Sequence, residues 1–135
     1  MAAHFMLDTD IVSYIRKRHL PQVRVRFERL KAGEAVLSVV TYGELLYGAL
    51  RSQNRDKAIL QLEELTAMLP VLALESESSQ HYGEIRAELA ARGEIIGNND
   101  LWIAAHARSQ GLILVTNNER EFKRVRGLKI ENWAK

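Results

Sequence analysis

The sequence predicts an α/β fold, with a mainly parallel sheet that helices flank on both sides. Short apolar runs suited to buried strands alternate with segments whose apolar residues recur at helical spacing. Apolar residues make up 47% of the 135 residues, which is enough to form a globular core. Because no repeat or flexible linker divides the chain, we expect a single domain over residues 1–135.

The expected elements follow one another without long loops. The expected strands are residues 4–7, 35–38, 71–74, 112–115 and 128–131. The expected helices are residues 9–15, 23–30, 39–50, 56–69, 78–91 and 100–111. Pro21 should separate the first two helices, since proline has no N–H to donate. Gly33 marks the turn before the second strand, and Gly93 is well placed to cap the fifth helix.

Composition excludes several classes of protein. The sequence has no cysteine, which rules out a disulfide framework, a thiolate zinc site and a cysteine nucleophile. No apolar run approaches the ~20 residues that span a bilayer, and Asp8 comes too early for a signal peptide. We therefore expect a cytoplasmic protein with no membrane segment.

Charge is distributed unevenly, although the net charge is only +2. Residues 1–31 contain seven basic and three acidic residues, and residues 108–135 contain the same numbers. Residues 32–107 contain five basic and eleven acidic residues. This pattern suits a protein that holds a polyanion beside an acidic metal site. In the alternative interpretation, these basic residues only form the solvated faces of helices: Arg16, Lys17, Arg18, Arg24, Arg26 and Arg29.

Acidic residues recur where the predicted strands end. Asp8 ends the first strand, Glu44 lies two turns into the helix after the second strand, and Asp100 opens the last helix. Glu121 lies just beyond the fourth strand. Ligands of open parallel sheets bind beyond the carboxyl ends of the strands, so these acids can meet in one pocket.

A pocket of unpaired carboxylates implies a cation, because the acids would otherwise raise each other's pKa. Mg²⁺ prefers oxygen ligands, and it usually takes one or two carboxylates and keeps several waters. It would activate a water and stabilise charge on a phosphodiester. Asp8 and Asp100 could instead be N-caps of the helices that they precede.

Four segments carry a resemblance to a known family, in the same order and at the same spacing. They are FMLDTDIVSYI at 5–15, SVVTYGELLYGA at 38–49, IGNNDLWIAAHA at 96–107 and LVTNNEREFKRVRGLKIENW at 114–133. These segments resemble the signatures of the PIN-domain family, and most of all its VapC branch, the ribonuclease half of bacterial type II toxin–antitoxin pairs. The resemblance implies a PIN-like three-layer fold and a Mg²⁺-dependent endoribonuclease, with Mn²⁺ as a possible substitute for Mg²⁺.

The resemblance also assigns roles to individual acids. It makes Asp8, Glu44 and Asp100 catalytic, with Asp8 and Asp100 as the metal ligands. Many relatives carry an aspartate where this chain has Asn118. Glu121 matches an acid of this branch, and we expect it to be catalytic in place of that missing aspartate.

Supporting residues and partners follow from the same resemblance. Asp10 stands where relatives often have asparagine, which favours a supporting role over a ligand role. Thr9 and Thr116 are expected to orient waters or carboxylates. The implied partners are an RNA substrate, a second copy of the chain in a homodimer, and a small VapB-like antitoxin held in a groove beside the acidic pocket. The predicted helices at 39–50 and 56–69 carry surplus large apolar residues suited to such contacts.

Two other functions fit parts of the sequence. The run Asp8-Thr9-Asp10-Ile11-Val12 satisfies the nucleophile motif of haloacid-dehalogenase-type phosphatases, but that mechanism also needs a downstream lysine and a second acidic pair. No lysine lies between Lys57 and Lys123. The non-enzymatic alternative is a module that binds RNA or protein without cutting, which an assay of Mg²⁺-dependent cleavage would separate from a nuclease.

Overall fold

The computed structural model of the protein describes residues 2–17 and 19–135. Its strands are β1 (Phe5–Leu7), β2 (Ala35–Ser38), β3 (Val71–Leu72), β4 (Ile113–Val115) and β5 (Ile130–Glu131). Its helices are α1 (Thr9–Lys17), α2 (Pro21–Glu28), α3 (Val39–Leu50), α4 (Arg55–Met68), α5 (Ser76–Ala91), α6 (Asn98–Gln110) and α7 (Glu119–Phe122). The predicted α/β class is confirmed.

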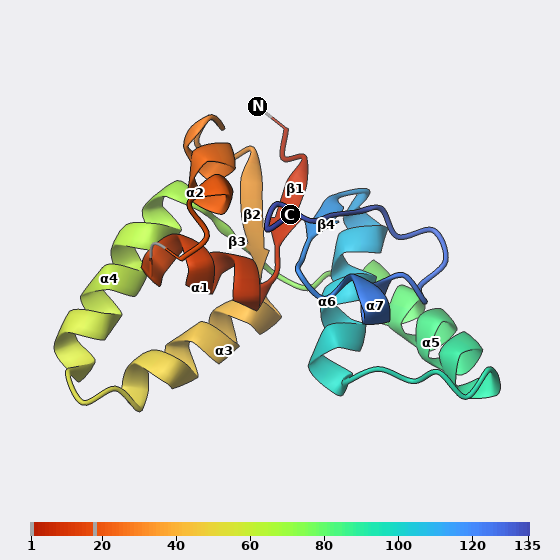
Figure 1. The fold of residues 1–135 in the computed structure, drawn as a ribbon. Coiled ribbons are helices and arrows are strands. Elements are labelled where there is room, and N and C mark those ends of the chain that lie inside the picture. Colours follow the sequence, from red (N-terminus) through yellow and green to blue (C-terminus); the bar gives the residue numbers. More distant parts are fainter. Residues whose placement is uncertain (1, 18) are drawn as a thin grey trace.

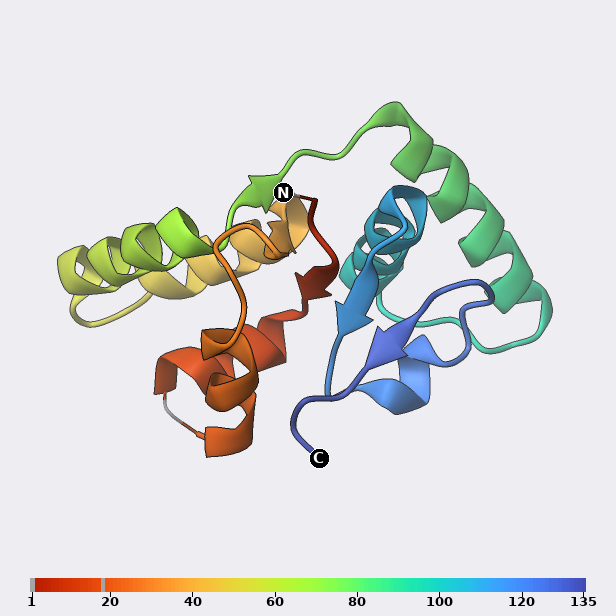
Figure 2. The same cartoon turned by 90° about the horizontal axis from the view of Figure 1, so that it is seen from above.

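The strands form one parallel sheet in the order β3–β2–β1–β4–β5, with β1 at its centre. The chain builds outward from β1 to β2 and β3, then crosses to β4 and β5 on the other side of β1. Figure 1 shows α1 to α4 on one side of the sheet and α5 to α7 on the other, and Figure 2 shows the same division from above. The strand order therefore reverses between β1 and β4, where open parallel sheets form their ligand crevice.

Successive residues of the three central strands point to opposite faces of the sheet. Three of them pack into the core beneath α5 and α6: Met6, Val36 and Leu114. Their neighbours pack into the core beneath α1 to α4: Leu7, Leu37 and Val115. All six side chains are 3% exposed or less. Burial on both faces explains why these strands appear in the sequence as continuous apolar runs.

Helix ends follow the backbone geometry of single residues. α2 begins at Pro21, because the first helical position needs no N–H donor. α5 and α6 end next to Gly93 and Gly111, whose φ angles of 68° and 67° are left-handed. After Gly93 the Glu94 N–H donates to the Leu89 carbonyl (2.9 Å), which closes the end of α5. The predicted cap at Gly93 is confirmed.

Most predicted boundaries lie within two residues of the observed ones, and one helix was missed. α7 has four residues, too few to show helical periodicity. The third and fifth strands each have two residues instead of the predicted four, and both are only half-buried because they form the sheet edges. α6 begins at Asn98, two residues earlier than predicted.

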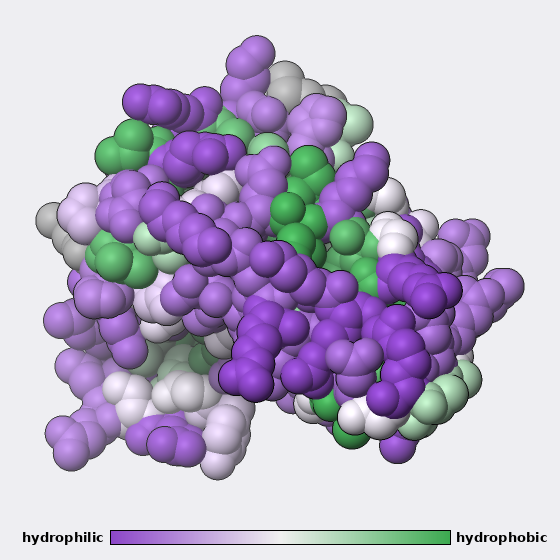
Figure 3. Space-filling model, turned by 45° about the vertical axis from the view of Figure 1, so that its right-hand side comes forward, coloured by the Kyte–Doolittle hydropathy of each residue, from purple (hydrophilic) through white to green (hydrophobic). Residues whose placement is uncertain are grey.

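The surface is mainly hydrophilic, with apolar side chains in separate patches on the face in Figure 3. Of the surplus apolar residues of α3 and α4, Leu45 and Leu62 belong to the core. Four others are exposed: Tyr47, Leu50, Leu60 and Met68. Within residues 2–17 and 19–135, no helix is long and apolar enough to cross a membrane.

Candidate active site

The four predicted acids come from four different elements. Asp8 follows β1, Glu44 lies on α3, Asp100 on the first turn of α6 and Glu121 on α7. The charges of Glu121 and Glu44 both raise the pKa of Asp100, and the charge of Asp100 raises the pKa of Asp8. The structure therefore brings the four acids into one electrostatic neighbourhood, in which Asp100 interacts with each of the others.

Asp8 is a buried carboxylate held at both oxygens. It is 7% exposed. Its Oδ2 accepts a hydrogen bond from the Thr116 hydroxyl (2.9 Å) and its Oδ1 accepts from the Thr9 N–H (2.8 Å). Burial raises the pKa of Asp8 to about 7, and the charges of Asp10 and Asp100 contribute, while the two hydrogen bonds act in the opposite direction. The Asp8 carboxyl can therefore exchange protons near neutral pH.

Asp100 is not an N-cap, because Gly97 occupies that position of α6. A Cβ at Gly97 would lie 3.4 Å from Asp100 Oδ2, so this carboxylate lies against the backbone of Gly97. Burial, followed by the charges of Glu121, Glu44 and Asp10, raises the pKa of Asp100 to about 6. The N-cap alternative is thus wrong for Asp100. It is partly right for Asp8, whose Oδ1 accepts from the first N–H of α1.

Hydrogen bonds from neutral side chains fix the two glutamates. The Thr9 hydroxyl donates to Glu44 Oε1 (2.6 Å), and Asn99 Nδ2 donates to Glu44 Oε2 (3.3 Å). Asn118 Nδ2 donates to Glu121 Oε2 (3.0 Å). Thr9 and Thr116 therefore orient carboxylates, as predicted. Asn118, at the position of the missing aspartate, holds Glu121 instead.

Among the described residues, no cationic side chain forms an ion pair with these acids. None of the ion pairs within residues 2–17 and 19–135 involves Asp8, Glu44, Asp100 or Glu121. The described part of the chain also contains no group of three acidic or histidine side chains arranged to hold a metal ion.

Comparison with known proteins agrees with this geometry. The PIN domain family matches residues 5–128 of the chain. Ribonuclease VapC2 of Haemophilus influenzae is 46% identical over 130 residues, which cover 96% of this chain and 98% of that protein. The chain belongs to the PIN-domain family.

Further PIN-domain relatives also belong to the VapC branch. The tRNA(fMet)-specific endonuclease VapC of Shigella flexneri is 45% identical, over 96% of this chain and 98% of that protein. A crystal structure of DNA-bound VapBC from Salmonella typhimurium contains a chain that is 40% identical, with a TM-score of 0.91, over 97% of this chain and 98% of that chain. The PIN-like three-layer fold and the VapC resemblance are both confirmed.

Sequence reasoning missed the amide residues around the PIN-domain acids. The Asn117 N–H donates to Asp10 Oδ2 (3.3 Å), and Asn117 Nδ2 donates to the Tyr14 hydroxyl (3.0 Å). Asn132 Nδ2 then donates to Asn117 Oδ1 (3.0 Å). The charge of Asp10 raises the pKa of Asp8, and the supporting role of Asp10 stays a prediction. The paired asparagines Asn98–Asn99 and Asn117–Asn118 at the starts of α6 and α7 were the available signal.

Proposed function

We propose that this protein is a Mg²⁺-dependent endoribonuclease. Its active site, in which RNA is hydrolysed, would be formed by the four acids Asp8, Glu44, Asp100 and Glu121. The observation that carries the proposal is the pair Asp8 and Asp100, with pKa values raised to about 7 and about 6 and with no cationic partner. Such a pair at the reversal of strand order is suited to a bound cation and to proton transfer near neutral pH. Membership of the PIN-domain family and the names of the ribonuclease relatives support the same reading.

The donor set fits Mg²⁺, for which we propose Asp8 and Asp100 as ligands, with Mn²⁺ as a possible substitute. Both residues offer carboxylate oxygens, and one or two carboxylates completed by water form a common Mg²⁺ site. A bound Mg²⁺ would neutralise the carboxylates and stabilise negative charge on a phosphodiester. Thr116 and Thr9 hold the Asp8 oxygens in place, and Thr9 and Asn118 hold the two glutamates, Glu44 and Glu121, which we propose would orient the attacking water.

Metal binding can be measured apart from cleavage. We expect millimolar Mg²⁺ to raise the melting temperature of the wild type by a few degrees, because a ligand that binds only the folded state stabilises it. Asp8→Asn and Asp100→Asn should remove this increase, whereas Asp56→Asn on the exposed start of α4 should keep it. An equal increase in all four proteins would contradict the proposed ligands.

Transfer RNA is the first substrate to test, because the Shigella flexneri relative is a tRNA(fMet)-specific endonuclease. Purified protein should cut initiator tRNA with Mg²⁺ and not with EDTA. Asp8→Asn, Glu44→Gln and Asp100→Asn should each lower the rate by at least about a hundredfold, and a double variant should be little worse because the acids act as a unit. Glu121→Gln should cost less. Full activity of Asp100→Asn would refute the site.

We also propose that the protein is the toxin of a toxin–antitoxin pair that acts in the cytoplasm as a homodimer and is inhibited by a VapB-like antitoxin. The solved relatives that are VapBC complexes support this partner. The apolar side chains exposed on α3 and α4 offer a surface for it. Expression of the protein alone should stop growth, and co-expression of the small neighbouring open reading frame should restore it. Sedimentation of the purified protein tests the homodimer.

A further inference from the structure

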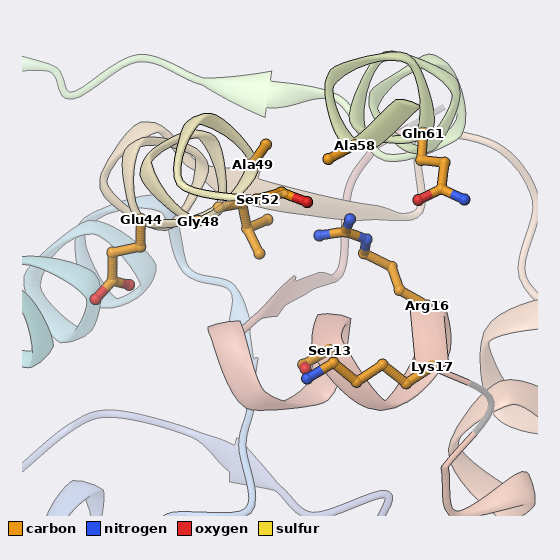
Figure 4. A pocket seen from close by; sticks show the side chains of 10 residues that line it. Ser13, Arg16, Lys17, Glu44, Gly48, Ala49, Ser52, Ala58 and Gln61 are labelled. Carbon is orange, nitrogen blue, oxygen red and sulfur yellow. The ribbon is translucent and has the colours of Figure 1, made fainter. Parts of the chain in front are cut away.

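A cavity of about 430 Å³ lies between α1, α3 and α4. Figure 4 shows Arg16 reaching from α1 into the space beside α4, with Glu44 at the opposite end. The lining is mixed: the Ser13 hydroxyl and the Gln61 amide lie alongside small or apolar residues such as Gly48 and Leu45. Glu44 belongs both to this cavity and to the acidic site, so the two are continuous.

One face of α1 connects the acidic site to the basic end of the cavity. Thr9, Ser13 and Lys17 follow at intervals of four residues and therefore share that face, with Arg16 beside Lys17. The Thr9 hydroxyl donates to Glu44 Oε1 at the acidic end. Thr9 and Arg16 are about 10 Å apart along the helix axis, from a rise of about 1.5 Å per residue. This length is comparable to that of a nucleotide.

The two cations at this end have no described protein partner. Arg108, by contrast, bonds to His81, Glu84 and the Arg126 carbonyl. In the described ranges, neither Arg16 nor Lys17 takes part in an ion pair. A guanidinium and an ammonium that line a cavity together favour a phosphate as ligand. The basic residues predicted for a polyanion thus include two that line a defined space, whereas Arg18 lies outside the described residues.

We propose that this cavity is a substrate subsite, which binds one nucleotide of single-stranded RNA next to the cleaved bond, with its phosphate held by Arg16 and Lys17. The proposal rests on the ribonuclease activity proposed above. Glu44 would then lie where the subsite meets the cleavage site, and α1 would set the distance between the bound phosphate and the catalytic acids. RNA is favoured over an apolar protein segment because the lining includes two cationic side chains, Arg16 and Lys17, that take part in no ion pair among the described residues.

The first test fills the cavity without disturbing the fold. A Cβ at Gly48 would have no atom within 4 Å, and the same holds at Gly83 on α5, across the sheet. Gly48→Gln should therefore keep the melting temperature and raise the Kd of a fluorescent 12-nucleotide RNA by about tenfold, measured in an Asp8→Asn background. Gly83→Gln is the matched control and should leave the Kd unchanged. Gly48→Ala gives a second variant if the glutamine lowers stability.

The second test removes the cations. Arg16→Ala/Lys17→Ala should lower the slope of log Kd against log salt by about 1, because the two side chains neutralise a single phosphate, whereas Arg29→Ala/Lys31→Ala should not. On initiator tRNA, the first pair should raise KM with little change in kcat. Unchanged RNA affinity in Gly48→Gln would overturn the subsite. The subsite would also be overturned if the Gly48 or Arg16/Lys17 variants escaped inhibition by the antitoxin but bound RNA as the wild type does. A wild type that binds the 12-nucleotide RNA in the cavity but cuts no RNA would overturn the proposed function alone.

Discussion

Asp8 is held in a position that opposes the stability of the fold. It follows the buried residues Met6 and Leu7 of β1, and its Oδ2 accepts a hydrogen bond from the hydroxyl of Thr116 at the neighbouring strand end. Two hydrogen bonds do not offset the desolvation of its charge, since its pKa remains raised to about 7. A carboxylate kept where ionisation is unfavourable indicates a functional requirement more than a structural one.

Replacing Asp8 should therefore stabilise the metal-free protein. Because the folded pKa is raised from 3.8 to about 7, the stability that Asp8 contributes is present at low pH and is lost as the pH rises to 7. We expect Asp8→Asn to raise the free energy of unfolding by about 2 kcal/mol at pH 8 and by less than half of that at pH 5. Urea unfolding in EDTA measures this, with Asp56→Asn as control. A loss of stability at pH 8 would contradict it.

Thr116 should tune the pKa of Asp8. Its hydroxyl hydrogen bond lowers that pKa, so Thr116→Val should move the acid limb of the pH–rate profile to higher pH by about one unit. Thr41 provides a matched control, because it is equally buried and its hydroxyl has no hydrogen-bond partner among the described residues. Thr41→Val should leave the profile unchanged and the stability equal or higher. Identical profiles for the two valine variants would show that Thr116 does not act on Asp8.

Three elements meet at a buried polar contact beside the carboxyl end of β2. The Ser38 hydroxyl accepts the Val40 N–H at the start of α3 (3.1 Å) and shares a hydrogen bond with His106 Nδ1 of α6 (2.8 Å). His106 is fully buried, and its Nε2 has no partner within the described residues. This contact joins α3 and α6, which carry Glu44 and Asp100. The relative position of the two helices that carry these acids therefore depends in part on His106, and burial lowers the pKa of His106, which favours its neutral form.

Acidification should weaken this junction of elements. Burial lowers the pKa of His106 below 6.5, so its contribution to stability is present above pH 6.5 and is lost as the pH falls. The buried aspartates respond in the opposite direction, so the comparison must be made between variants. The stability difference between wild type and His106→Gln should shrink below pH 6.5, which urea unfolding of the two proteins at several pH values measures. A difference independent of pH would contradict the prediction.

The elements of the centre could be predicted, and those of the edges only in part. β2 and α3 have the predicted bounds because complete burial leaves continuous apolar runs and α3 keeps a helical stripe. β3 and β5 are held by single neighbours, so their length depends on pairing that a local pattern does not contain. At the site, Asp8 could be located from the end of the first strand and Asp100 from the start of the last predicted helix. The partners of Glu44 could not, because Thr9 and Asn99 meet it only through contacts 35 and 55 residues apart in the sequence.

At the scale of the whole molecule, the exposed apolar groups of α3 and α4 define where a partner should bind. Leu60 and Met68 are 55% and 57% exposed, whereas Leu62 is 1% exposed and belongs to the core. Leu60→Lys and Met68→Lys should therefore weaken protection by the antitoxin without lowering tRNA cleavage. Leu62→Lys should instead destabilise the fold, since it would bury a charge. If the antitoxin fully protects cells that express either of the two exposed variants, this surface is not its binding site.

The central position of β1 also governs when the protein can become active during its own synthesis. Asp8 leaves the ribosome well before the residues that complete its site. The hydroxyl that bonds to Asp8 belongs to Thr116, 108 residues later, and the neighbouring strand β4 begins at Ile113. A nascent chain that still has these residues in the exit tunnel can pair β1 with β2 but cannot close the acidic pocket. If the protein cuts RNA as proposed, the translating ribosome is therefore not exposed to a finished nuclease until β4 and Thr116 have left the exit tunnel.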